Sequence, residues 1–159
     1  MHNIQFATET NLILSNIIND YVLFEISDEL YALKLLNIKE IVSNRNIVEI
    51  EDLPDFIKGF ANIRNVIFPI FDLKKNLALE NIKKYGKYSV IIIFEDSLEK
   101  LALLADSVLD IYNIPEESFK PYPICNDKYC SFIEYEVELN NQMVKIINAE
   151  KFIKLKYQI

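Results

Sequence analysis

The sequence predicts a mainly β fold of two small, intimately packed barrels followed by a short C-terminal helix. The chain has 159 residues, 51% of them apolar, which is enough to build the core of one domain. From Asp20 onward, short runs rich in Val, Ile, Phe and Tyr alternate with clusters of Asn, Asp, Ser and Pro. Such alternation is typical of many short strands. An internal repeat divides this strand-rich part into two similar units.

The repeat is continuous over 21 residues, because a shift of 70 lays residues 22–42 on residues 92–112 without a gap. The identical pairs are Phe24/Phe94, Glu25/Glu95, Ser27/Ser97, Glu29/Glu99, Ala32/Ala102, Leu33/Leu103 and Ile41/Ile111. Similar pairs, such as Ile38/Val108 and Glu40/Asp110, lie between them. We therefore expect one barrel at about residues 20–85 and the other at about residues 86–150.

Each copy predicts the same series of elements, namely a strand, a polar turn, a second strand, and a third strand or bend. The turns are expected at residues 27–29 and 96–100, and the third strands at 38–42 and 108–112. Further strands are expected at residues 47–50, 66–71, 131–139 and 143–147. Asn140 and Asn141 tolerate positive φ and should form the turn of the last hairpin.

Two short helical segments are predicted from capping residues. Asp52 is a good N-cap, Pro54 suits a first helical turn, and Gly59 supplies a left-handed stop, so residues 52–59 should form one capped turn. The tail predicts a short helix with Asn148 as its N-cap and with Phe152 and Leu155 on its buried face.

Residues 1–19 form a preamble whose apolar residues could line one face of a helix. A docked helix and a frayed terminus are both open interpretations. The preamble lacks the features of a secretory signal, and no stretch approaches the roughly 18–20 apolar residues that span a bilayer. We therefore expect a cytoplasmic protein without direct membrane insertion.

Composition argues against catalysis, metal or cofactor binding, and nucleic-acid binding. The formal net charge is -7, whereas nucleic-acid binding relies on clustered Lys and Arg. The single histidine, His2, lies in the preamble, and two glycines are too few for a phosphate loop. Cys125 and Cys130 have no neighbouring thiol or imidazole to complete a metal site. A binding function is expected instead.

Residues 59–73, GFANIRNVIFPIFDL, contain the most unusual strand. Apolar residues alternate onto both faces of residues 66–71, so both faces should be buried. Pro69 cannot donate a ladder hydrogen bond, which indicates an edge, a bulge or a bend, either at a barrel corner or in a wall between barrels. Arg64 lies between the turn formers Asn62 and Asn65, and is either a solvated charge or an anchor for a partner's carboxylate.

This region resembles the CheW family of bacterial chemotaxis adaptors. Residues 53–73 resemble its central motif, which has a proline, an apolar-Lys-Gly step, Asn-apolar-Arg-Gly, and an apolar run with Pro that closes on Asp-Leu. Residues 21–42 resemble the first hairpin and the following strand, and residues 104–123 resemble a second-barrel segment with a basic residue and a proline, here Lys120 and Pro121. The match covers residues 20–155.

The resemblance implies one domain, residues 20–159, of two five-stranded SH3-like barrels. It also implies a non-catalytic adaptor that binds the cytoplasmic tip of chemoreceptors and the regulatory domain of the histidine kinase CheA. The implied receptor- or partner-binding residues are Ile38, Glu40, Gly59, Asn62 and Arg64. The implied kinase-binding residues are Lys120 and Pro121.

The chain departs from the family pattern at Asn65, which replaces a glycine, and at the bulky Phe60 and Phe71. Asn is the next best residue for a left-handed position, so the turn should survive. The alternatives are a homologous scaffold for a different receptor and kinase pathway, or a small β-barrel that binds a ligand or nucleic acid. A nucleic-acid-binding barrel predicts a basic groove with exposed aromatic residues.

Overall fold

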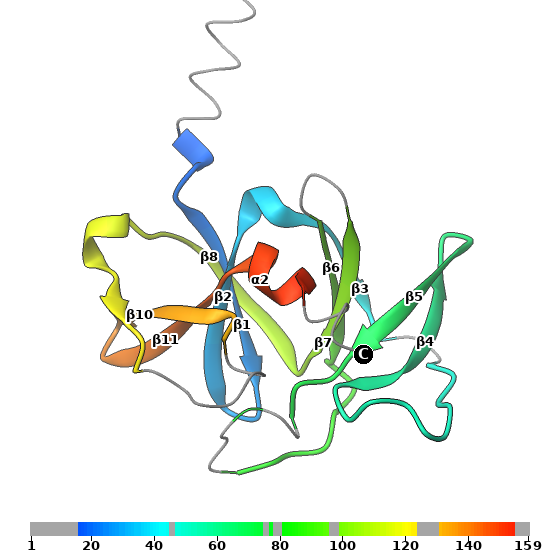
Figure 1. Cartoon of the computed structure of the whole chain (residues 1–159). Helices are drawn as coiled ribbons and strands as arrows, with labels where there is room; N and C mark the ends of the chain where they lie inside the picture. Colours follow the sequence, from blue (N-terminus) through cyan, green and yellow to red (C-terminus); the bar gives the residue numbers. More distant parts are fainter. Residues whose placement is uncertain are drawn as a thin grey trace, which may run out of the picture.

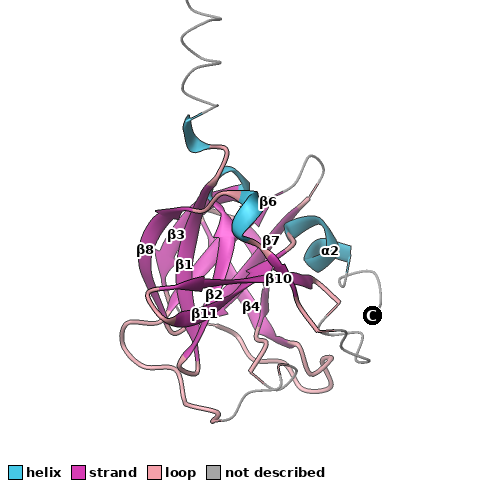
Figure 2. Ribbon diagram, turned by 90° about the vertical axis from the view of Figure 1, so that its left-hand side faces the viewer, coloured by secondary structure: helices cyan, strands magenta, loops and turns pink. Residues whose placement is uncertain are grey.

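The computed structural model describes residues 16–44, 47–74, 77, 81–95, 99–123 and 131–154, and strands predominate in them (Figure 2). The strands are β1 (Asp20–Ile26), β2 (Glu29–Lys34), β3 (Ile38–Ser43), β4 (Ile57–Ile63), β5 (Val66–Phe71), β6 (Val90–Glu95), β7 (Lys100–Ala105), β8 (Ser107–Asn113), β9 (Lys120–Pro121), β10 (Ile133–Leu139) and β11 (Gln142–Ile147). The 3-10 helices are η1 (Leu35–Asn37) and η2 (Glu116–Ser118), and helix α2 (Ala149–Lys154) follows β11. The mainly β prediction is confirmed. Residues 1–15 of the preamble, Cys125 and Cys130 lie outside the described residues.

Each of the two sheets takes strands from both halves of the chain (Figure 1). One sheet, which we call the first barrel, has the order β3-β6-β7-β5-β4, and the second barrel has the order β8-β1-β2-β11-β10-β9. The β1–β2 hairpin therefore pairs with β8 and β11, and the β6–β7 hairpin pairs with β3 and β5. Because the two hairpins are exchanged, a division at about residue 85 does not separate the strands of one barrel from those of the other.

In each sheet, the chain that leaves one edge strand pairs again at the opposite edge, and this pairing closes the sheet into a barrel. After β3, Val48 exchanges two backbone hydrogen bonds with Phe60 of β4, at 2.8 and 3.0 Å. After β8, the short strand β9 pairs with β10. The strand expected at residues 47–50 is therefore wrong in extent, because only Val48 makes ladder contacts there and it meets a single residue of β4.

The 70-residue repeat is visible in the strands. The bounds of β1, β2 and β3, shifted by 70, fall within one residue of those of β6, β7 and β8. The β4–β5 and β10–β11 hairpins also correspond, since each ends in a two-residue turn with positive φ. The φ angles are 51° and 65° at Arg64 and Asn65, and 50° and 62° at Asn140 and Asn141. The turns predicted at Asn65 and at Asn140 and Asn141 are confirmed, whereas Asn62, which was also expected to form a turn, lies within β4 and pairs with Ile67.

The largest core cluster contains residues of both barrels, and α2 completes it. The ring of Phe152 in α2 lies 5.4 Å from that of Phe71 in β5, 5.3 Å from Phe94 in β6 and 5.0 Å from Phe132, measured between centroids. All four rings are fully buried. The helix thus holds the two barrels together through aromatic packing.

The start of α2 is fixed by the predicted cap. The Asn148 side-chain oxygen accepts the backbone N–H of Lys151 at 3.0 Å, which is the N-cap interaction. The Asn148 amide also donates to Glu134 of β10 at 3.0 Å, so the cap ties the helix to the second barrel. Phe152 is buried as expected, whereas Leu155 lies outside the described residues.

Pro69 occupies a position of the β4–β5 ladder where no backbone N–H donor is needed. Its partner in β4 is Phe60, whose backbone N–H and C=O both bond to Val48 on the opposite side. The Phe60–Pro69 pair is therefore a non-hydrogen-bonded pair of the antiparallel ladder, where no N–H is needed. On its other side, β5 pairs with β7 only from Ile70 onward. The expected stop in pairing therefore holds only on the β7 side, because the ladder with β4 continues past the proline to the Ile63–Val66 pair.

Two other predictions for this region are wrong. Gly59 does not end a helical turn but lies inside β4, and its φ is not positive. A Cβ at Gly59 would lie 2.2 Å from the Val48 carbonyl oxygen, so close approach of two backbones explains the glycine. Val66 and Ile67 were expected inside, yet they are 51% and 70% exposed, because the tip of the hairpin extends beyond the sheet.

Candidate functional site

The turn of the β4–β5 hairpin presents Arg64 at one end of the first barrel. Its two residues both adopt left-handed φ, which is the type I′ geometry that favours Asn or Gly. Asn65 meets this requirement at low cost, whereas an arginine in this conformation is unusual. The turn itself therefore gives no reason for an arginine, and a contact made by its side chain must supply one.

That contact is an ion pair with Glu40 of β3. The Arg64 Nε lies 2.8 Å from Glu40 Oε1 and 3.1 Å from Oε2, and Nη2 lies 2.7 Å from Oε1. The Arg64 side chain is 79% exposed and the Glu40 side chain 25%. Hydrogen bonding to Glu40 raises the pKa of the Arg64 guanidinium above its ordinary value. The pair links the hairpin to the opposite edge strand of the sheet.

The other three residues predicted for this site have different roles. Asn62 is exposed on β4, two residues before Arg64. Ile38 is half-buried at the start of β3 and packs against the central core. Gly59 is buried beneath Val48. Glu40, Asn62 and Arg64 therefore reach solvent together, whereas Ile38 and Gly59 support the strands that carry them.

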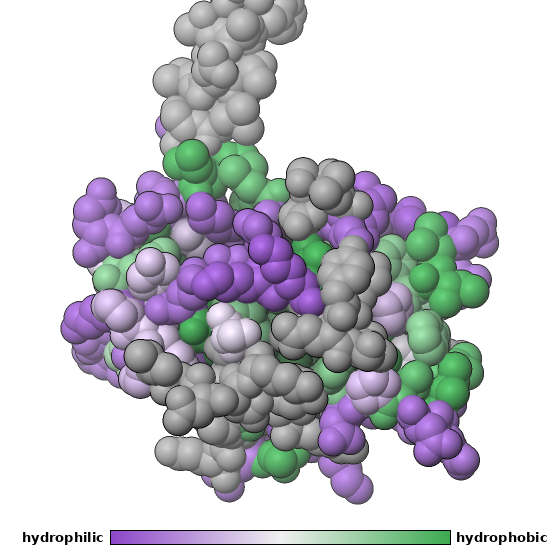
Figure 3. Space-filling model, in the orientation of Figure 1, coloured by the Kyte–Doolittle hydropathy of each residue, from purple (hydrophilic) through white to green (hydrophobic). Residues whose placement is uncertain are grey.

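Exposed apolar side chains lie on β3, on the segment between β3 and β4, and at the start of β5, next to Arg64 in the chain. We call this region, with Glu40 and Arg64, the first-barrel tip. Its apolar members are Ile41, Val48, Ile50, Val66 and Ile67. The green area at the right of Figure 3 lies over the β4–β5 hairpin and shows this side of the molecule. Sequence reasoning missed this feature, because an alternating apolar strand is ordinarily buried.

The predicted kinase-binding residues lie on the other barrel. Lys120 and Pro121 form the edge strand β9, are both exposed, and pair with Glu136 and Tyr135 of β10. The structure does not bring them next to Arg64, which belongs to the other sheet. The two predicted groups therefore form two separate surfaces.

A cavity of about 590 Å³ lies beside β9 and the start of α2. One wall is a row of aromatic rings, with Tyr21 to Phe119 at 5.7 Å and Phe119 to Tyr135 at 5.8 Å between centroids. Burial, and to a lesser extent Glu116, raises the pKa of Tyr21 to about 12, so its hydroxyl stays protonated. Ion pairs and hydrogen bonds occupy the carboxylates around the opening, including Glu134 with Lys151.

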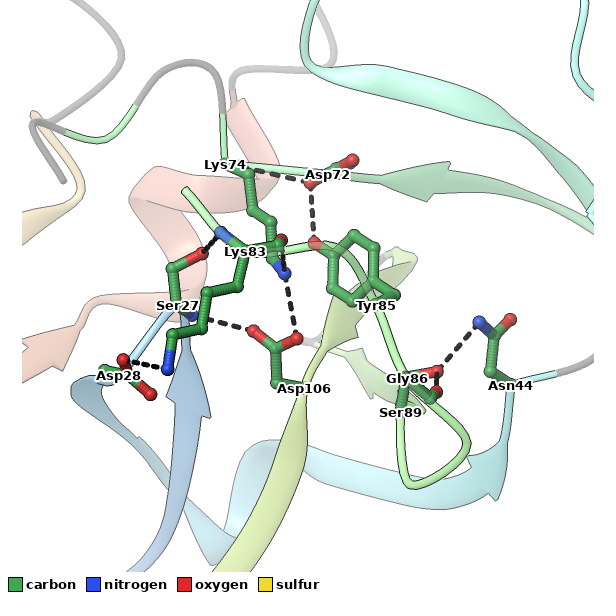
Figure 4. Close-up of polar contacts among 10 residues, drawn as sticks. All are labelled: Ser27, Asp28, Asn44, Asp72, Lys74, Lys83, Tyr85, Gly86, Ser89 and Asp106. Atoms are coloured by element: carbon green, nitrogen blue, oxygen red, sulfur yellow. Dashed lines mark hydrogen bonds and ion pairs between the residues drawn. The ribbon is translucent and has the colours of Figure 1, made fainter. Parts of the chain in front are cut away.

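A buried polar network joins the two barrels beside the β1–β2 turn (Figure 4). The Lys74 ammonium lies 2.8 Å from Asp106 Oδ1 and 3.6 Å from the centroid of the Tyr85 ring. Asp106 Oδ2 accepts the backbone N–H of Ser27 at 2.7 Å, and the Tyr85 hydroxyl donates to Asp72 at 2.6 Å. The network connects the β1–β2 turn, the β7–β8 turn and the segment between β5 and β6. Sequence reasoning missed Lys74, whose burial had no signal in the pattern.

Neither a metal centre nor a membrane span is found in the part of the chain that the structure describes. No three His, Cys, Asp or Glu side chains there are grouped to hold a metal ion. None of the described helices is long and apolar enough to cross a bilayer.

Comparison with known proteins gives one consistent result. Residues 20–156 match the model of the CheW-like domain. The chain is 29% identical over 117 residues to the chemotaxis protein CheW of Klebsiella aerogenes, covering 74% of this chain and 70% of that protein. It is 23% identical to the chemotaxis protein CheW of Helicobacter pylori, covering 84% and 81%.

A solved structure agrees with these matches. The scaffolding protein TtCheW from Thermoanaerobacter tengcongensis superposes with a TM-score of 0.73 at 32% identity, covering 82% of this chain and 84% of that one. The fold described above therefore has its counterpart in a known CheW scaffolding protein. This chain belongs to the CheW-like domain family.

Proposed function

We propose that this protein is a non-catalytic cytoplasmic adaptor that couples chemoreceptors to the histidine kinase CheA. Membership of a chemotaxis scaffold family supports the proposal. The observation that carries it is the first-barrel tip, where the strands and the segment that carry the Glu40–Arg64 ion pair and lie next to it in the chain also expose apolar side chains. An arginine within an apolar patch is the typical composition of an energetically important protein interface.

In this proposal, Ile38, Glu40, Gly59, Asn62 and Arg64 form or support the surface that binds the receptor. Lys120 and Pro121, on the other barrel, belong to the surface that binds the kinase. A receptor helix would bury its apolar face against the barrel, and the kinase would pack barrel to barrel. Many such copies in an array would add avidity to individually modest contacts.

The test is the charge reversal Arg64→Glu. It removes the ion pair and places two carboxylates together, so binding of a receptor cytoplasmic fragment should weaken by about 30-fold or more, the effect of a hot-spot residue. Lys154→Glu is the matched control, because it reverses an exposed charge that is paired with Glu150 on α2. Affinities would be measured by titration calorimetry with the receptor fragment and, separately, with the kinase regulatory domain.

The double reversal Glu40→Arg with Arg64→Glu separates two roles of the arginine. If the partner contacts the arginine directly, the double variant should still bind weakly. If the ion pair serves only to position the hairpin, the double variant should bind with the original affinity. Unchanged affinity of Arg64→Glu for both partners would contradict the assignment. Retention of nucleic acid at low salt without kinase binding would contradict the adaptor function itself.

A further inference from the structure

The second barrel contains an unfilled counterpart of the place that Arg64 occupies in the first barrel. The 70-residue shift lays Glu40 on Asp110, and the structure keeps their surroundings equivalent. Glu40 pairs with Ile93 in the β3–β6 ladder, and Asp110 pairs with Leu23 in the β8–β1 ladder, where Leu23 and Ile93 are also related by a shift of 70.

The turns that face these carboxylates correspond as well. The β4–β5 turn follows the Ile63–Val66 pair, and the β10–β11 turn follows the Leu139–Gln142 pair. Arg64 and Asn140 are therefore both the first residue of a two-residue turn with positive φ. The arginine of the first barrel is replaced by a much shorter side chain in the second.

A cavity of about 240 Å³ lies at this place in the second barrel. Leu23, Leu30 and Leu139 line its apolar part, and Asp110, Tyr112 and Asn140 supply its polar groups. Asn140 donates to the Tyr112 hydroxyl at 3.3 Å and does not reach Asp110 as Arg64 reaches Glu40. Asp110 Oδ1 accepts the N–H of Ile111 at 2.8 Å, and among the described residues Oδ2 makes no hydrogen bond or ion pair.

We propose that this cavity receives the guanidinium of an arginine side chain from a protein partner, with Asp110 as its carboxylate ligand. The first barrel provides the precedent, because the equivalent strand β3 and the equivalent β4–β5 turn hold the Arg64 guanidinium there through three contacts of 2.7 to 3.1 Å. Arginine suits such a site because its planar fork binds a carboxylate at two points and stacks on aromatic rings. The cavity is below the range of about 300–1,000 Å³ typical of small-molecule sites, so a single side chain fits better than a metabolite.

The inference does not rest on the proposed chemotaxis role and is tested without any chemotaxis partner. The probe is N-acetyl-arginine amide, titrated into the whole ¹⁵N-labelled chain while the amide signals of Ile111, Asn140 and Gln142 are followed by NMR. We expect a saturable shift of these signals in the millimolar range. The neutral isostere N-acetyl-citrulline amide should give none, because it has no charge to pair with Asp110.

Two variants make the test specific. Asp110→Asn should weaken arginine binding about tenfold, the loss expected for a charge-assisted hydrogen bond. Asn140→Arg should abolish it, because the new side chain reaches Asp110 from within the chain as Arg64 reaches Glu40. Asn141→Arg is the matched control, because it adds the same charge at the next turn position and should leave binding intact.

Any one of three results would overturn the proposal. They are the absence of a saturable shift with the unmodified chain, an equal response to N-acetyl-citrulline amide, and unchanged arginine binding in Asp110→Asn. The Asp110→Asn result decides the matter even if one of the turn variants folds poorly, since Asp110 is exposed on β8 and its replacement keeps the shape of the side chain.

Discussion

Gly59 shows that a glycine can be fixed by a neighbour and not by its own backbone angles. We predict that Gly59→Ala lowers the free energy of unfolding by about 1–3 kcal/mol, because the new Cβ would overlap the Val48 carbonyl at 2.2 Å and open the Val48–Phe60 bridge. Urea denaturation measures the loss, and hydrogen exchange of the Phe60 amide reports the bridge. Unchanged protection of that amide would show that the two backbones separate without breaking their pairing.

Lys74 is the single-residue feature with the greatest expected effect on stability. Its ammonium is buried, and Asp106 is its carboxylate partner. We predict that Lys74→Met lowers the free energy of unfolding by about 3 kcal/mol, because it leaves the Asp106 carboxylate unpaired in a largely buried place. Lys83→Met, which removes only an exposed pair with Asp28, should change stability little. Equal effects of both variants in urea denaturation would contradict a special role for Lys74.

A residue of unusual type, such as Arg64, could be recognised from the sequence. A residue of ordinary type in unusual surroundings, such as the buried Lys74, could not. Arg64 stands out in an acidic chain at a turn, and the family resemblance placed Glu40 in the same predicted partner-binding surface, although their ion pair was not predicted. Lys74 follows an Asp-Leu pair in a charged stretch, so nothing local separates it from a solvated lysine. Its buried position depends on residues that are distant in the chain. Asp106 lies 32 residues from Lys74, and Ser27, which donates to Asp106, lies 79 residues from Asp106.

Helix α2 gives a prediction at the scale of elements. Glu134 accepts hydrogen bonds from Lys151 and from Asn148, and these contacts lower the pKa of its carboxyl below the ordinary value of 4.5. A lowered folded-state pKa contributes stability that is present above pH 4.5 and is lost as the pH falls through the folded value. Glu134→Gln should therefore flatten the dependence of stability on pH below that value. Urea denaturation at several pH values would detect it, and an unchanged slope would contradict the coupling.

The cap itself is a separate prediction. Asn148→Ala removes both the N-cap bond to Lys151 and the link to Glu134, so the free energy of unfolding should fall by about 1 kcal/mol. The loss should appear first as faster hydrogen exchange in α2, before any change in the strands. A fall in protection spread evenly over the barrels would mean that the cap acts through the whole fold.

Most elements were predictable because their signals are local. Turn residues, apolar alternation and the cap at Asn148 located the β1–β2 and β10–β11 hairpins and α2, whereas β4 was missed because a helical turn was expected at residues 52–59. The segment at residues 47–50 was not predictable, because a single bridge at Val48 depends on where β4 lies in space. The exposure of Val66 and Ile67 was missed for a related reason, since a periodic pattern cannot tell how far a hairpin extends past its sheet.

The exchange of hairpins concerns the whole molecule. The β1–β2 and β6–β7 hairpins are copies of one another, so the pattern that predicts them does not say which one completes which barrel. This near-equivalence is why the sequence predicted two barrels and yet assigned the strands to contiguous halves. The connections and the shared aromatic core decide the pairing, and both are properties of the folded chain.

We predict that residues 1–85 and 86–159, expressed separately, do not fold as isolated barrels, because the cut divides the core that Phe71, Phe94, Phe132 and Phe152 share. Mixed in equal amounts, they should regain the dispersed NMR spectrum of the intact chain. A folded spectrum from the first fragment alone would show that its own hairpin can take the exchanged place.

The exchanged hairpins also determine how the molecule carries load. The exchanged hairpin of each barrel continues directly into a strand of the other barrel, since β2 leads through η1 into β3 and β7 leads into β8. The two ends, with the β4–β5 turn on one side and the β10–β11 turn on the other (Figure 1), are thus joined by β7 and β8, which only Asp106 separates, and by the core that both barrels share. A protein made this way sets a fixed spacing between whatever its two ends hold.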